Sequence, residues 1–153
     1  KGAMGFMVNI PLESLDFAGL LKETGLENVV IRRENIRLLN GGPVDIQHGF
    51  LLHTADFSHE NTVPVTDGVS VSANLEALQA FAEGATPREG LMVLGYSGWG
   101  EGQLDQELLE NAWLVVDADY DILFNTPLED RWDRAYSRLG VNPVQMTLEA
   151  GTA

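Results

Sequence analysis

One short segment combines the residue types most suited to recognition or catalysis. Gly95–Gly102 (GYSGWGEG) contains four glycines, with Tyr96 and Trp99 among them, and follows the apolar run Leu91–Leu94. Glycine accepts positive φ angles and lets another backbone or a ligand come close. The segment is therefore predicted to be either a tightly folded corner or a ligand-facing loop between a strand and a helix.

The glycine spacing partly matches a phosphate-binding loop. Bare backbone and the N–H groups at the start of a helix attract anions. However, Gln103 stands where the dinucleotide fingerprint has its third glycine, and Glu101 and Asp105 place negative charge beside the phosphate position. No Lys-Ser/Thr pair follows either. Nucleotide binding is the weaker interpretation, and no cofactor is predicted.

Ser97 lies in a sequence that resembles part of the nucleophile elbow of hydrolases. That turn requires glycine two residues after the serine, and Trp99 occupies this position. A serine nucleophile also needs a base. The candidates are His48, His53 and His59, and nothing in the sequence links any of them to Ser97. An enzyme acting at this segment is the alternative hypothesis, and no catalytic residue is assigned.

A metal site is a further candidate. His53, Asp56, His59 and Glu60 have suitable side chains, but they extend across a strand end and a loop, and no HExxH pattern is present. We expect a strand-end histidine to be satisfied by backbone groups or water, so no metal is predicted.

Aromatic and polar residues near the glycines have two interpretations each. Trp99, with glycine on both sides, either packs into the core or stacks on a partner. Gln103, Glu107 and Asn111 recur every fourth residue along the following helix, where they form a solvated face or the wall of a site.

The elements that must position these residues are short strands and helices in irregular alternation, which predicts a single α+β domain. Alternating apolar residues and turn signals indicate strands at 4–10, 29–32, 36–39, 50–53, 62–66, 69–72, 91–94 and 113–116. Capping signals indicate helices at 15–23 after Ser14, 75–83 after Asn74, 103–111, from Asp117 to 124, from Thr126 to 139, and from Asn142 to Gly151.

The charge of the chain argues against direct contact with nucleic acid. Nine Lys and Arg stand against 23 Asp and Glu, which gives a formal net charge of −14. Such a field repels a polyanion, and the best basic cluster, Arg32, Arg33 and Arg37, is interrupted by Glu34. The chain has no cysteine and no apolar run of membrane-spanning length, so a cytoplasmic protein is expected.

Several blocks of sequence resemble the AlgH/YqgE family of bacterial proteins. The blocks are GAMGFMVN (2–9), NGGPV (40–44), FLLH (50–53), LGYSGWGEGQLDQELLENAW (94–113) and LFNTPLEDRWDRA (123–135), followed by LGV. The similarity extends along the whole chain, and GYxGWGxGQLxxE is a specific pattern. Members usually begin with a further strand and loop ahead of GAMG, which are expected to be absent here.

The resemblance implies a fold and leaves the activity open. It implies an α+β domain over 1–153 with a bifurcated, mostly antiparallel sheet curled into a pseudo-barrel and flanked by helices. Many members are labelled transcriptional regulators, yet the residues show no helix-turn-helix pattern. We therefore predict a non-enzymatic regulatory or interaction protein with a protein or small-molecule partner and no membrane association. The motif positions that carry over as candidate binding residues are Gly41, Gly42, Pro43, Gly95, Tyr96, Gly98, Trp99, Gly100, Gln103, Glu107 and Asn111.

Overall fold

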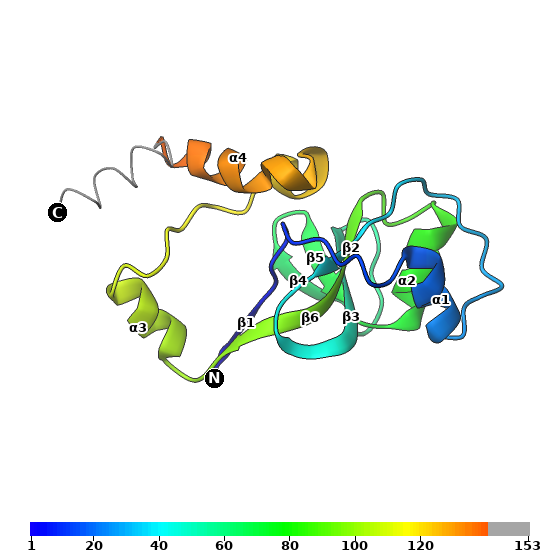
Figure 1. Cartoon of the computed structure of the whole chain (residues 1–153), viewed down its shortest axis with the longest axis horizontal. Helices are drawn as coiled ribbons and strands as arrows, with labels where there is room; N and C mark the ends of the chain where they lie inside the picture. The colour runs from blue at the N-terminus through cyan, green and yellow to red at the C-terminus, as the bar shows by residue number, and fades with distance from the viewer. Residues whose placement is uncertain (141–153) are drawn as a thin grey trace.

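A six-stranded sheet organises the computed structural model, which describes residues 1–140 (Figure 1). The long central strands are β3 (Val44–Thr54) and β6 (Gly90–Trp99). The order is β1-β6-β3-β5-β4, and all these neighbours are antiparallel. The shorter strands are β1 (Ala3–Gly5), β2 (Leu38–Asn40), β4 (Val63–Thr66) and β5 (Val69–Ser72).

The sheet divides along one edge of β6. Residues 92–94 of β6 pair in parallel with β2, whereas residues 97–99 pair antiparallel with β1. The other edge of β6 pairs with β3. The predicted α+β class and bifurcated, mostly antiparallel sheet are therefore confirmed, and the sheet curls into a half-barrel.

Two helices cover one side of the sheet, where α1 (Phe17–Glu23) and α2 (Leu75–Glu83) lie beside each other (Figure 1). Side chains alternate between the faces of β6: Met92 belongs to the core under these helices and Val93 to a second cluster. The first cluster contains Phe17, Leu20, Leu21, Leu38, Leu51, Ala77, Leu78, Phe81, Ala82, Met92 and Leu94. The second contains Leu39, Phe50, Val93 and Leu128.

The ends of α2 were predicted correctly from local signals in the sequence. The Asn74 side chain accepts a hydrogen bond from the backbone N–H of Ala77 at 2.8 Å, and Gly84 ends the helix with φ of 87°. The first residue of the helix, Leu75, is exposed, whereas Ala77, Leu78, Phe81 and Ala82 are buried. At α1 the cap is Asp16, which accepts from the N–H of Gly19 at 2.7 Å, and Ser14 was the wrong residue.

Other predicted elements differ from the structure. β1 ends at Gly5, short of the predicted 4–10, and β3 is longer than the predicted 50–53. Residues 29–32 and 113–116 form no strand, although both segments are largely apolar. The strands predicted at 62–66 and 69–72 are confirmed as β4 and β5, which form a hairpin with Gly68 at a φ of 75° in its turn. The helix expected from Asn142 to Gly151 lies outside the described residues.

The chain after β6 leaves the sheet and returns to it. α3 (Gln103–Leu109) stands apart from the body, an extended segment follows, and a π-helical turn (Asp121–Asn125), a 3-10 turn (Leu128–Asp130) and α4 (Arg131–Arg138) complete the described part (Figure 1). Within the described residues, no helix is both long and apolar enough to serve as a membrane span.

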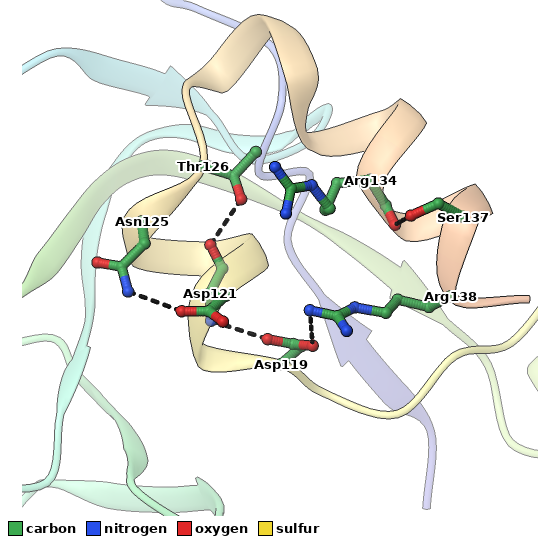
Figure 2. A network of polar contacts seen from close by, with 7 residues as sticks. All are labelled: Asp119, Asp121, Asn125, Thr126, Arg134, Ser137 and Arg138. Atoms are coloured by element: carbon green, nitrogen blue, oxygen red, sulfur yellow. Dashed lines mark hydrogen bonds and ion pairs between the residues drawn. The ribbon is translucent and has the colours of Figure 1, made fainter.

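Polar contacts tie α4 to the turn that precedes it (Figure 2). Arg138 pairs with Asp119 at 2.9 Å, and the other oxygen of Asp119 accepts from the backbone N–H of Asp121 at 2.8 Å. The helix predicted to begin at Asp117 begins instead at Asp121, whose backbone N–H donates to Asp119. The Thr126 hydroxyl donates to the Asp121 carbonyl at 2.7 Å. Thr126 therefore does not cap the helix that was predicted to run from Thr126 to 139.

Candidate functional site

The glycine segment is largely a strand. Residues 95–99 continue β6 and pair with β1, so the loop predicted for Gly95–Gly102 is confined to Gly100–Gly102. Sequence signals missed this because glycine weakens strand propensity, whereas here the pairing partners decide the conformation.

Close contact between two backbones explains three of the candidate glycines. Gly95 has φ of 79°, and a Cβ on it would lie 2.5 Å from the carbonyl oxygen of Gly42. A Cβ on Gly41 or Gly42 would in turn collide with the backbone of Gly95 or Tyr96. The backbone N–H of Gly41 also donates to the Leu94 carbonyl at 2.8 Å. These buried glycines therefore have a structural role where the NGGP turn crosses β6.

A carboxylate joins two tryptophans at the far end of β6. The Glu107 Oε2 atom accepts from the indole N–H of Trp99 at 3.1 Å and from that of Trp113 at 2.7 Å. The two rings meet edge to face, with centroids 5.9 Å apart. Gln103 donates to the other oxygen of Glu107 at 3.1 Å and accepts from the N–H of Gly100 at 2.9 Å. We call Trp99, Gln103, Glu107 and Trp113 the indole–carboxylate cluster.

The hydrogen bonds of this cluster favour the ionised carboxylate. The pKa of Glu107 lies below its ordinary value because of the hydrogen bond from Trp113 first, and those from Trp99 and Gln103 next, while desolvation opposes them. Trp99 is half-buried: its ring lies over Gly5, where an added Cβ would come 3.2 Å from the indole. Trp99 therefore packs in part against β1, and its stacking on a partner stays a prediction.

The remaining candidates are spread around this cluster. Tyr96 packs edge to face on Phe50, with ring centroids 6.0 Å apart, and belongs to the second core cluster. Asn111 lies beyond the end of α3 with φ of 58°. Pro43, in the turn before β3, and Gly98, in β6, are both exposed. The predicted polar line is thus shortened to Gln103 and Glu107.

Exposed apolar side chains recur along residues 103–116, which we call the α3 arm, and together we call these side chains the apolar strip. Leu109 is 78% exposed, Trp113 48%, and Val115 66%. No residue of α3 is buried, so Leu104 and Leu108, although one turn apart, do not belong to the core. Sequence reasoning missed this surface because WLVV has the pattern of a buried strand.

One of the candidate histidines, His53, does contact a serine hydroxyl, but that serine is Ser72 and not Ser97. His53 is fully buried, its Nε2 lies 2.8 Å from the Ser72 hydroxyl, and its Nδ1 lies 2.7 Å from the Thr54 carbonyl. The Ser72 hydroxyl also contacts that of Thr62 at 2.8 Å. Because Ser72 is only 1% exposed, this pair has the character of a satisfied core network.

The metal-ligand candidates are divided among different partners. Asp56 accepts from the Thr54 hydroxyl at 2.6 Å and from the Arg88 N–H at 2.9 Å, while His59 lies 3.3 Å from the Asn74 amide. Within residues 1–140, no group of three or more His, Cys, Asp or Glu is arranged to hold a metal ion.

Comparison with protein families and relatives gives a consistent result. The family model described as AlgH-like matches residues 1–144. A UPF0301 protein of Caulobacter vibrioides is 44% identical over 99% of this chain and 78% of its own length. UPF0301 proteins of Rhodopseudomonas palustris and Vibrio cholerae are 41% and 38% identical, over 73% and 83% of their lengths and 100% and 99% of this chain.

Two solved structures resemble the fold. The solution structure of the AlgH protein from Pseudomonas aeruginosa matches with a TM-score of 0.75 and 39% identity, over 95% of this chain and 77% of that one. A crystal structure of a Corynebacterium diphtheriae protein matches with a TM-score of 0.57 and 19% identity, over 78% of this chain and 62% of that one. The second likeness concerns the fold alone.

Proposed function

The chain belongs to the AlgH-like family, and we propose that it is a non-enzymatic interaction domain whose α3 arm binds an apolar, positively charged surface of a partner protein. The observation that carries this proposal is the exposed apolar strip on the arm, surrounded by acidic residues. Contiguous apolar side chains on the surface of a soluble domain are typical of interaction sites.

The composition of the arm supports a protein partner. Leu109, Leu114 and Val115 are at least half exposed, and Trp113 offers a large ring with its N–H already bonded to Glu107. Tryptophan is enriched among residues that dominate binding energy. The indole–carboxylate cluster fixes the start of the arm relative to β6, which lowers the entropic cost of presenting it.

Charge indicates what kind of surface the arm would contact. Between Arg88 and Arg131 the chain contains no Lys or Arg, whereas Glu101, Asp105 and Glu110 lie in or beside α3. Two arms brought together would place acid against acid, so a second copy is disfavoured as occupant. A partner with basic residues around an apolar patch is complementary.

A regulatory effect on transcription would, on this proposal, be indirect. The net charge of −14 disfavours direct contact with DNA, so any such effect would pass through the bound protein. A gel shift at physiological salt with excess competitor DNA is expected to show no complex. The buried His53–Ser72 pair provides no accessible nucleophile for the enzyme alternative.

A pair of matched variants tests the proposal. Leu109→Glu places a charge in the strip, and Val30→Glu places the same charge at another exposed apolar position, 62% exposed and outside the arm. We expect the first variant to lose a partner that wild type and the second retain on quantitative affinity purification. All three proteins should unfold at similar temperatures. Equal retention by both variants would refute the role of the arm.

A further inference from the structure

Away from the α3 arm, three arginines surround a cavity of about 470 Å³. Its walls are the segment 33–39 before and within β2, Phe81 of α2, residues 89–91 at the start of β6, and residues 127–131, which lead into α4. Arg33, Arg37 and Arg131 line it, which is a third of the nine basic residues of a strongly acidic chain. The volume is within the range of small-molecule sites.

Two of these guanidinium groups have no carboxylate partner in direct contact within the described residues. The Arg33 side chain donates to the carbonyls of Phe81, Pro87 and Arg88 and lies 4.2 Å from the centroid of the Phe81 ring. Backbone carbonyls satisfy its donors without neutralising its charge. Glu89 and Asp56 influence it only from a distance.

Arg131 is the most buried of the three, at 9% exposure. It donates to the carbonyls of Val8 at 2.5 Å and Thr126 at 3.3 Å, and no ion pair within 4.0 Å involves it among residues 1–140. Burial lowers its pKa, Glu129 acts in the opposite direction, and the nearby Arg37 lowers it further. A buried cation beside a second cation is costly unless an anion accompanies it.

Arg37 completes the arrangement at the cavity mouth. Its Nη1 atom pairs with Glu129 at 2.6 Å, and both side chains are about half exposed or more. Such an exposed pair contributes little to stability. An incoming anion could therefore compete with Glu129 for Arg37 at low cost.

We propose that this cavity binds a small organic anion, a carboxylate or phosphate carried on an apolar group, through Arg37 and Arg131. The apolar part would contact Ile36, Leu39, Leu91 and Leu128, which line the same cavity. Guanidinium groups suit both kinds of anion because they offer paired donors. Glu34, Glu89 and Glu129 also line the cavity, so a ligand with few charges is favoured.

The experiment uses benzoate, phenyl phosphate and the neutral isostere benzamide, titrated into the ¹⁵N-labelled whole chain. At least one of the two anions is expected to shift the amide signals of residues 33–37, 89–91 and 127–131 saturably, with benzamide binding much more weakly. The stronger of the two identifies carboxylate or phosphate as the preferred group. Absence of saturable shifts with both anions, or equal binding of benzamide, would overturn the proposal.

Charge variants distinguish a specific anion site from an effect of the overall charge. Arg37→Gln should weaken anion binding about tenfold, whereas Glu129→Gln should strengthen it by freeing Arg37. Arg32→Gln is the matched control, because Arg32 is exposed and outside this cavity. If Arg37→Gln and Arg32→Gln weaken binding equally, the loss reflects only the removal of one positive charge from the chain, and the site does not exist. Preserved amide spectra of each variant establish that the fold is intact.

Discussion

The contact between the NGGP turn and β6 allows a sharp prediction for Gly95. Replacement by alanine places a Cβ 2.5 Å from the Gly42 carbonyl oxygen while φ remains at 79°. A left-handed conformation costs a non-glycine residue about 1–2 kcal/mol. Separation of the two backbones would also weaken the Gly41 N–H bond to the Leu94 carbonyl, for about 1 kcal/mol.

The reduced entropy of the unfolded chain returns about 0.4–1 kcal/mol, so Gly95→Ala should destabilise the protein by about 2 kcal/mol. With a urea dependence of about 2 kcal/mol per molar for a domain of this size, its unfolding midpoint should fall by about 1 M. Circular dichroism followed through a urea titration measures this directly.

Gly98 is the matched control, because it lies in the same strand but its φ is not positive. A Cβ there would be 3.6 Å from the Tyr96 ring, an ordinary contact. Gly98→Ala should be neutral or stabilise by about 0.5 kcal/mol. If both variants lower the midpoint equally, or if Gly95→Ala leaves it unchanged, the structural explanation of the glycine motif is wrong.

Two further predictions concern the polar networks. The pKa of Glu107 is lowered in the folded protein. Its carboxylate therefore stabilises the folded protein at every pH above the ordinary glutamate pKa of about 4.3. This stabilisation is lost as the pH falls through the lower pKa of the folded state. The fluorescence of Trp99 and Trp113 should therefore change in that acid range, and Glu107→Gln should remove the transition; an unchanged transition would contradict the assignment. Ser72→Ala should cost about 1–3 kcal/mol in urea unfolding because it leaves the buried Nε2 of His53 without its donor. Ser72→Thr should recover most of this loss, and a cost near zero for the alanine variant would show that the contact does not matter.

Local signals in the sequence predicted those parts of the fold that local interactions decide. Asn74 and Gly84 fix the ends of α2 through their own backbone and side-chain chemistry, and Asp67-Gly68 fixes a two-residue turn. The Gly95–Trp99 segment required non-local information, since β1 and the NGGP turn determine its conformation. The spacing of its glycines is compatible with a tight corner and with a ligand-facing loop alike.

The candidate site was predictable only in part for the same reason. Gln103 and Glu107 were identified from helical spacing, but Trp113 joins them through a hydrogen bond that no periodicity indicates. The apolar run 113–116 has the pattern of a strand, yet pairs with no strand in the described part of the chain. The arginine cavity was missed because Arg37 and Arg131 are far apart in sequence.

The most direct measurement of the proposed function is site-specific photo-crosslinking in living bacteria, with benzoylphenylalanine at position 109 and, in a parallel strain, at position 30. Both native side chains, Leu109 and Val30, are well exposed. We predict one discrete adduct from position 109 only, in which the crosslinked peptide of the partner carries Lys or Arg beside apolar residues. Adducts of equal yield from both positions, or only self-adducts of this chain at position 109, would contradict the α3 arm as its recognition surface.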